Sequence, residues 1–324
     1  MRFALMTEPQ QGLAYGEILA LARAAESAGF ETFFRSDHYT SFPGAAGLPT
    51  TDAWTTLAGL ARETDRIGLG VLVSPVTFRG PGLLAKIVTT VDEMSGGRVE
   101  LGLGAGWNDR EHEEFGFPFP DVRTRFDMLE EQLEIMHRLW TDPDGWSFDG
   151  AHWQVHGARL VPRPVERPGR RHPNLIVGGE GKPRTARLAA TWADEFNISS
   201  AGPEGVRAGF ERVLRACEAA GRDPDTLVRS AMAGALIAPT HRELSERVGA
   251  LLRMLGRDEA GAEAWLAERR PRWILGTHDE ALEQVARYEA AGAQRIMLQD
   301  LLPRDLDMVR EMAEVLDLGE PAVA

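Results

Sequence analysis

Residues 67–107 decide the fold of this chain, and they read IGLGVLVSPVTFRGPGLLAKIVTTVDEMSGGRVELGLGAGW. The stretch opens with an apolar, β-branched run at 67–73, which predicts a buried strand. A helix-period pattern follows at 81–94; it starts on a proline, which suits a first helical turn, and ends shortly before two glycines. A second apolar run at 99–103 predicts another strand. The stretch is therefore a strand–helix–strand unit, and α/β folds build their sites beyond the carboxyl ends of such strands.

The same alternation continues along the chain. Apolar strand patterns occur at 2–6, 31–34, 67–73, 99–103, 174–177, 194–198, 228–238 and 295–298. Amphipathic helix patterns occur at 13–28, 53–64, 81–94, 123–140, 183–192, 205–220, 279–291 and 304–316. Eight strands that alternate with helices predict an α/β fold, the (β/α)8 TIM barrel. A doubly wound open sheet is the second choice, because alternation alone does not show whether a sheet closes.

Two segments interrupt this rhythm, and we expect them to be insertions after strands 4 and 7 of a single barrel domain, residues 1–324. Residues 141–173 contain five prolines and a β-hairpin pattern at 146–162, followed by an extended return. Residues 239–271 carry two further helix patterns. Together with the loop 39–52, these insertions are expected to supply the walls of a substrate site.

The composition is that of an ordinary globular protein, with 43% hydrophobic and 26% charged residues. A net charge of −13 argues against a nucleic-acid partner, because such binding needs cations that neutralise phosphates. No apolar run approaches the roughly 20 residues that span a membrane. The single cysteine, Cys217, lies in a helix pattern and is expected to be a small buried side chain. We therefore expect a cytoplasmic protein without membrane or nucleic-acid partners.

Polar residues and glycines at the predicted strand ends are the candidates for chemistry. His38 follows strand 2 beside Asp37, and an imidazole exchanges protons near neutral pH. The same residues also suit a turn with a solvated histidine. Gly178, Gly179 and Gly181 lie between strand 5 and the following helix pattern. Glycines there allow a ligand to approach the backbone, and a helix N-terminus attracts a phosphate, although a tight turn explains them equally well.

Several common motifs do not fit. Residues 102–106 spell G-x-G-x-G, not the dinucleotide pattern G-x-G-x-x-G, and no acidic residue follows at the expected distance. These glycines instead suit the close approach of a flat ring. The sequence contains neither H-E-x-x-H nor G-x-S-x-G, which argues against a metal site and against a serine hydrolase. The arginines at 163–171 are read as solvated surface rather than as an anion site.

In combination, these motifs resemble the bacterial luciferase-like monooxygenase superfamily, and within it the oxidoreductases that depend on the deazaflavin coenzyme F420. The resemblance rests on Ser36-Asp37-His38, SPVTFR at 74–79, DEMSGGRVELGLGAGW at 92–107, IVGGEGKPRTARLAATWADEFN at 176–197 and LGTHDEALEQVARYEAAGAQRIMLQ at 275–299. It implies a barrel with the coenzyme ring in its mouth. It also implies hydride transfer between F420 and a small organic substrate, and a homodimer.

The resemblance further implies roles for individual residues. It places a non-proline cis peptide at Leu72–Val73, in a bulge behind the ring. Asp37 and His38 lie beside the ring, with His38 as the proton donor or acceptor. The remaining coenzyme contacts are backbone of Val73, Ser74, Pro75, Ala105 and Gly106 around the ring, and Gly178, Gly179 and Gly181 at the phosphate.

One departure from the family concerns the substrate. The sugar-phosphate dehydrogenases of this family carry a second acid–base glutamate where this chain has Trp107, which makes the pocket more apolar and can stack on a substrate. Glu111, at the start of a helix, is the alternative acid–base group. Two other functions stay open: an FMN-dependent luciferase-like monooxygenase, and a non-catalytic member that binds a flavin or nothing. The non-catalytic member predicts a mouth filled by side chains of 239–271, whereas the Ser-Asp-His sequence favours F420 over FMN.

Overall fold

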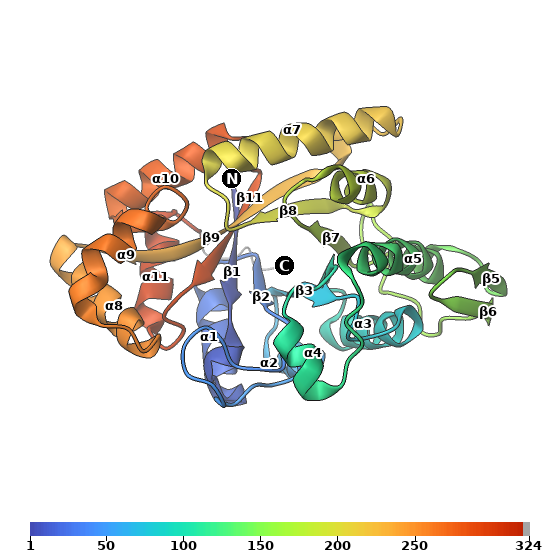
Figure 1. Cartoon of the computed structure of the whole chain (residues 1–324), viewed down its shortest axis with the longest axis horizontal. Helices are drawn as coiled ribbons and strands as arrows, with labels where there is room; N and C mark the ends of the chain where they lie inside the picture. Colours follow the sequence, from blue (N-terminus) through green and yellow to red (C-terminus); the bar gives the residue numbers. More distant parts are fainter. Residues whose placement is uncertain (320–324) are drawn as a thin grey trace.

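The computed structural model describes residues 1–319, and its centre is a closed barrel of parallel strands (Figure 1). Neighbouring strands pair in the order β1-β2-β3-β4-β7-β8-β9-β11, and β11 pairs with β1 to close the ring. The strands are β1 (Arg2–Thr7), β2 (Thr32–Arg35), β3 (Gly68–Pro75), β4 (Val99–Gly104), β7 (Asn174–Gly178), β8 (Glu195–Ser199), β9 (Val228–Ala238) and β11 (Arg295–Asp300). The predicted (β/α)8 barrel is confirmed, and the open sheet is wrong. The last five residues of the predicted domain 1–324 lie outside the described residues.

The sequence pattern does not predict a further strand, β10 (Ile274–Thr277), which joins the same sheet. β8 pairs with the first half of β9, at 228–232, and β10 pairs with its second half, at 235–238. β9 is long enough, at 11 residues, to serve both neighbours. An apolar run as short as that of β10 has no periodicity that separates a strand from a loop, which explains the omission.

Helices surround the barrel and cover its outer face (Figure 1). They are α1 (Tyr15–Ser27), α2 (Ala53–Glu63), α3 (Pro81–Ser95), α4 (Asp109–Phe115), α5 (Val122–Thr141), α6 (Pro183–Trp192), α7 (Pro203–Ala219), α8 (His241–Met254), α9 (Ala262–Arg269), α10 (His278–Ala290) and α11 (Leu306–Val315). The short helix α4 is absent from the periodic helix patterns, but it agrees with the expectation that Glu111 lies at the start of a helix. Within residues 1–319, we find no helix with the length and apolar character needed to cross a bilayer.

The first insertion forms the predicted hairpin, β5 (Trp146–Asp149) and β6 (Gln154–Ala158). Glu131 of α5 fixes its tip, because the carboxylate accepts the N–H groups of Ala151 at 2.8 Å and Trp153 at 2.9 Å. Figure 1 places the hairpin at the edge of the molecule, beyond α5. It therefore lies away from the mouth, contrary to the expectation that residues 141–172 supply a substrate wall.

Two apolar layers pack the barrel. The larger layer lies between the strands and the helices, and the smaller fills the barrel interior with Ala4, Met6, Phe34, Leu72, Ile176, Met232 and Met297. Below the inner layer, at the amino-terminal ends of the strands, lies Arg295, which is 1% exposed. Its guanidinium pairs with Glu31, Glu100 and Glu195 at 2.7, 2.8 and 3.0 Å, and a buried charge requires such partners. This cluster plugs the amino-terminal end, so a ligand reaches the barrel from the carboxyl-terminal end.

Candidate functional site

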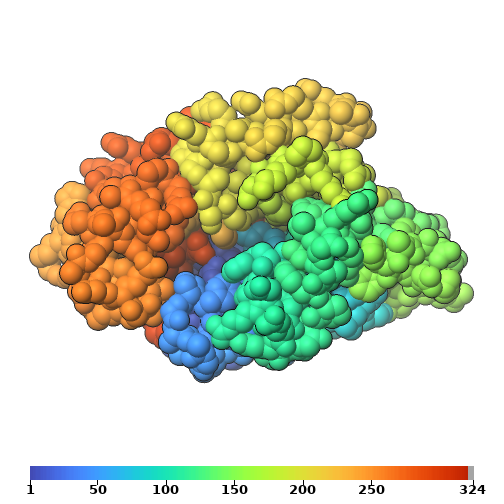
Figure 2. Space-filling view, in the orientation of Figure 1, coloured from blue at the N-terminus to red at the C-terminus, as the bar shows by residue number. Residues whose placement is uncertain are grey.

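The mouth of the barrel is the hollow at the centre of Figure 2. Segments that follow the carboxyl ends of several strands ring this hollow, namely the blue loop after β2, the green segment around α4, the yellow-green helix α6, the yellow helix α7, and the orange region of α8 and α9. Because these segments all follow strand ends, side chains that are distant in the sequence face one opening.

A bulge in β3 shapes one side of the mouth. The pairing of β3 with β4 shifts register here, and the peptide Leu72–Val73 is cis, as the resemblance implies. The Val73 side chain lies against β4 and β7. A Cβ on Gly102 or Gly104 would lie 2.9 or 2.8 Å from a Val73 methyl carbon, closer than real Cβ atoms approach, and at Gly102 it would also lie 2.6 Å from the carbonyl oxygen of Val71. A Cβ on Gly178 would make a tight contact of 3.0 Å with Val73. Close packing against β3 therefore explains the G-x-G pattern of β4, and no dinucleotide is needed to account for it.

The surface beside the bulge consists of small residues. Five positions expected to contact a coenzyme are partly exposed there: Val73, Ala105, Gly106, Gly178 and Gly179. The backbone at these strand ends is accessible, which is what the close approach of a flat ring would require.

The loop after β7 leads into the start of α6. Gly181 is buried with φ at +68°, and its Cβ position lies 2.9 Å from the carbonyl oxygen of Gly209 in α7. Arg212 donates to the carbonyl oxygens of Glu180 and Gly181, both at 2.8 Å. No side chain caps the N-terminus of α6, whose first residue is Pro183, so its free N–H groups stay available to an anion.

Asp37 anchors the loop after β2 and is 1% exposed. Its carboxylate accepts hydrogen bonds from Arg79 at 2.6 Å and from the hydroxyl of Ser74 at 2.7 Å. Trp54 donates its indole N–H to the same hydroxyl at 3.0 Å. The structure thus brings Asp37 and Ser74 together, and their polar atoms face each other and Arg79 rather than the open mouth.

Arg79 links Asp37 to a second carboxylate, Asp52, at 2.5 Å. Burial alone would lower the pKa of Arg79, but Asp37 and its neighbours raise it. Burial alone would raise the pKa of Asp52, but the N–H of Thr55 and the charge of Arg79 lower it to about 2. Both groups are therefore charged at neutral pH. The network fixes the residues on either side of His38.

His38 and Glu111 form the central pair of the mouth. Nδ1 of His38 lies 2.9 Å from Oε1 of Glu111, which is 1% exposed. The other carboxylate oxygen of Glu111 accepts the backbone N–H of Tyr39 at 3.0 Å. Because the carboxylate accepts, Nδ1 carries the proton and Nε2 is the nitrogen left for a ligand. With both oxygens used within the protein, the position of Glu111 suits orienting His38 more than exchanging protons with a ligand.

Two aromatic rings stand next to His38. The Phe42 ring lies edge-on to the imidazole with centroids 4.5 Å apart, and Trp107 lies 5.8 Å from the imidazole and 5.4 Å from Phe42. Trp107 is 67% exposed, which is unusual for an indole in a folded protein. Its free face makes this side of the mouth apolar and able to stack on a ligand.

Glu8 is a polar residue of the mouth that sequence reasoning missed. It follows β1 directly and is partly exposed. Its carboxylate accepts from the amide of Gln299 at the end of β11, at 2.7 Å, and from Gln10. The sequence does contain a signal that could have identified Glu8, because this residue lies at the carboxyl end of the first strand, just as His38 follows the second.

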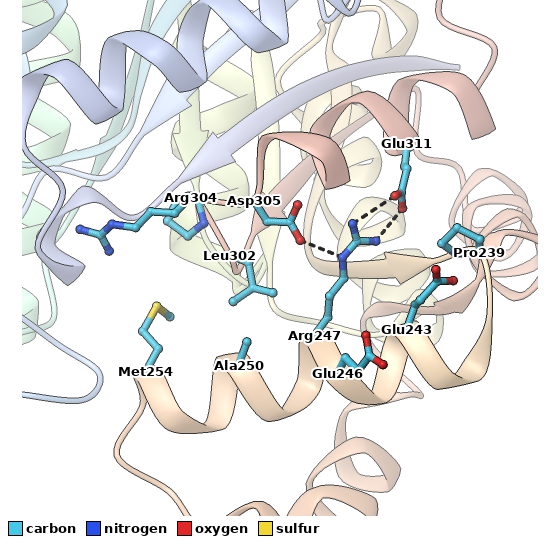
Figure 3. Close-up of a pocket in the computed structure, with 11 residues that line it drawn as sticks. Pro239, Glu243, Glu246, Arg247, Ala250, Met254, Leu302, Arg304, Asp305 and Glu311 are labelled. Atoms are coloured by element: carbon cyan, nitrogen blue, oxygen red, sulfur yellow. Dashed lines mark hydrogen bonds and ion pairs between the residues drawn. The ribbon is translucent and has the colours of Figure 1, made fainter.

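A groove of about 720 Å³ between α8 and α11 is a separate feature (Figure 3). Arg247 of α8 reaches across it to Asp305 at 2.8 Å and to Glu311 of α11 at 2.6 Å. These ion pairs join α8 to the start and the middle of α11, so the groove lies where the second insertion packs on the barrel. Within residues 1–319, the groove included, no three histidine, cysteine or carboxylate side chains are grouped to hold a metal ion.

Comparison with curated proteins gives a consistent picture. A family model described as luciferase-like monooxygenase matches residues 1–295. An F420-dependent glucose-6-phosphate dehydrogenase from Nakamurella multipartita is 30% identical over 316 residues, covering 92% of this chain and 90% of that protein. A protein of the same description from Intrasporangium calvum is 33% identical over 180 residues, which is 54% of this chain but only 51% of the relative.

Solved structures show the same fold. An F420-dependent secondary alcohol dehydrogenase, in complex with an F420–acetone adduct, superposes with a TM-score of 0.82 and 20% identity over 98% of both chains. The F420-dependent tetrahydromethanopterin reductase of Methanopyrus kandleri gives a TM-score of 0.75 at 19% identity, over 99% of this chain and 98% of that one. At these identities, the similarity establishes the barrel and not the reaction.

Proposed function

This chain belongs to the luciferase-like monooxygenase family, and from that premise we propose that it is an oxidoreductase that uses coenzyme F420 to move a hydride to or from a small organic molecule. Relatives named as F420-dependent dehydrogenases align over about nine-tenths of both chains, which supports this choice of coenzyme. The observation that carries the proposal is the mouth itself: a surface of small residues beside the β3 bulge, with His38 held next to it.

The residues present fit such a coenzyme. A flat ring needs a surface without protruding side chains, and the glycines that accommodate Val73 provide it. Val73, Ser74, Pro75, Ala105 and Gly106 would flank the ring. Gly178, Gly179 and Gly181, with the uncapped start of α6, would hold the phosphate. When bound, the coenzyme supplies the hydride chemistry.

The protein's own contribution is to orient the ligand and to handle the proton. Glu111 holds Nδ1 of His38, so Nε2 presents itself to the substrate as proton donor or acceptor. Asp37 acts at a distance, because its ion pair with Arg79 fixes the loop that carries His38. Trp107 and Phe42 offer an apolar surface on that side, which favours an apolar substrate that stacks on the exposed indole and displaces water from it.

Coenzyme fluorescence quenching tests the proposal. The purified protein is titrated with F420 and, separately, with FMN, and tight binding of F420 is expected. Tight binding of FMN alone would identify the FMN-dependent monooxygenase instead. Binding of F420 without turnover of any alcohol, ketone, enone or imine in a substrate screen would identify a non-catalytic member.

The role of His38 is tested by His38→Ala. Turnover is expected to fall by about 10²–10⁴-fold, because the proton-transfer group is lost, while F420 affinity stays near that of the wild type. His156→Ala, on the exposed strand β6, is the matched control. An unchanged rate in His38→Ala would remove the imidazole from this role.

We also expect a homodimer in the cytoplasm, as the resemblance implies. Light scattering on the purified protein measures its mass in solution, and a monomer at assay concentration would contradict the dimer.

A further inference from the structure

The position of Glu111 depends on α4, a helix of seven residues whose N-cap residue, Asn108, provides no side-chain cap. A helix this short is not stable by itself, because its few hydrogen bonds do not offset the cost of forming the first turn. Contacts with the rest of the protein must therefore hold it. Of the seven residues only Glu111 and His112 are buried, so these two side chains determine how α4 lies on the barrel.

His112 joins α4 to the segment that follows the β3 bulge. Its imidazole is 1% exposed, and Nδ1 lies 2.6 Å from the carbonyl oxygen of Asn108, which can only accept. Nδ1 therefore carries the proton, and Nε2 accepts the hydroxyl of Thr77 at 2.6 Å. The rings of Phe119 and Phe78 enclose the imidazole, with centroids 4.2 and 5.1 Å away. With both nitrogens used within the protein, His112 is placed to hold α4 and not to meet a ligand.

The segment that contains Thr77, residues 74–79, also holds the residue before His38. Ser74 and Arg79, at its two ends, donate to the carboxylate of Asp37 at 2.7 and 2.6 Å. This carboxylate is buried, so the loop that carries His38 is fixed on the same segment.

The segment 74–79 is therefore attached to the direct neighbour of each member of the His38–Glu111 pair, since His112 directly follows Glu111. We propose that His112 is the positioning residue of this pair: it fixes α4 on the segment, so that the carboxylate of Glu111 meets Nδ1 of His38. The contact of 2.9 Å between the two groups then keeps Nε2 of His38 directed at the substrate. This assignment rests on the proposed function, in which His38 transfers the proton.

His112→Phe tests the assignment, because it removes both hydrogen bonds and keeps an aromatic ring between Phe78 and Phe119. With the substrate that the wild type converts fastest, kcat is expected to fall by about 10- to 100-fold, since a small displacement of the carboxylate misaligns the imidazole. KM and F420 affinity stay near those of the wild type. His137→Phe on α5 is the matched control, because this imidazole also lies beside an aromatic ring, 5.5 Å from that of Trp192.

Thr77→Val and Thr77→Ser test the same contact from its other side. Valine keeps the size of the side chain but has no hydroxyl, so kcat is expected to fall by up to about 10-fold. Serine keeps the hydroxyl, and Thr77→Ser should retain the wild-type kcat.

A double-substitution cycle shows whether His112 acts through Glu111. In the Glu111→Ala background, His112→Phe should lower kcat no further, because the group that it positions is absent. Nitrogen-15 NMR of the imidazoles in the coenzyme-free protein gives a second readout, with the His38 signals assigned by their loss in His38→Ala. The wild type is expected to carry the His38 proton on Nδ1, and His112→Phe should move it partly to Nε2. A merely structural role would lower stability in urea unfolding without changing this tautomer.

A wild-type kcat in His112→Phe, an equal further fall in the Glu111→Ala background, or an unchanged His38 tautomer would each overturn the assignment. If His112→Phe does not fold, the comparison of Thr77→Val with Thr77→Ser decides. If the wild type binds no F420 or converts no substrate, the proposed function fails, and the NMR experiment alone decides whether His112 positions the imidazole. If the wild type is active and only the His112 results fail, the proposed function stands.

Discussion

Gly104→Ala places one methyl group at the floor of the proposed coenzyme site. The new Cβ would lie 2.8 Å from Cγ2 of Val73 and 3.8 Å from its Cβ, with no other atom within 4 Å apart from chain neighbours. Val73 is partly exposed, so its side chain can yield only toward the mouth, where the ring is proposed to lie. Overpacking of this kind costs about 1–3 kcal/mol. If the displaced Val73 side chain occupies the position proposed for the ring, the free energy of F420 binding becomes less favourable by this amount. F420 affinity then drops by about 5- to 150-fold.

The assay is a fluorescence-quenching titration of F420, together with urea unfolding of the coenzyme-free protein. Gly16→Ala is the control, because its Cβ in α1 meets no atom within 4 Å. F420 affinity in Gly104→Ala equal to that of the control, with Val73 displaced in a crystal structure, would refute the placement of the ring. Equal affinity with Val73 in its original position would refute the steric reasoning instead.

Three further predictions concern the barrel plug, the histidine and the aromatic wall. Burial alone would raise the pKa of Glu100, but Arg295 lowers it from 4.5 to about 2, so Glu100→Gln should reduce the free energy of unfolding at pH 7 by about 3 kcal/mol. In urea unfolding, the stability difference between wild type and Glu100→Gln is complete above about pH 4.5 and disappears as pH falls toward 2. The reason is that Arg295 stabilises only the charged form of Glu100. Glu111→Gln leaves Nδ1 of His38 without its carboxylate, so kcat should fall about 10²-fold with unchanged F420 affinity; equal kcat would show that the pair does not orient the imidazole. Trp107→Ala should raise KM for apolar substrates by about 2- to 12-fold without affecting F420 affinity, and an unchanged KM would place the substrate elsewhere.

Local patterns explain why so much of the fold follows from the sequence. The alternation of apolar strands with amphipathic helices is set by residues a few positions apart, and so is the glycine-rich end of β4. Closure of the sheet is different, because it depends on β11 reaching β1 across nearly the whole chain. The short strand β10 and the short helix α4 have too few residues for a periodic signal.

The candidate site also combines residues that the sequence identifies with contacts that only the structure shows. His38, Glu111 and Trp107 are visible as polar or aromatic residues after strands, but their spacing does not show that a carboxylate 73 residues away holds the imidazole. Asp37 is equally visible, yet only the structure shows that its charge faces Arg79 rather than the open mouth.

The sequence by itself determined the order of strands and helices, the residues at the strand ends and, through its resemblance, the family and the position of the Leu72–Val73 bulge. Only the tertiary structure decided which strand ends meet. Barrel closure brings Glu8 to Gln299 and His38 to Glu111, and it leaves the hairpin outside the mouth. The physical reason is that side-chain direction and register across a closed sheet depend on all eight strands at once, whereas periodicity reports on one element at a time.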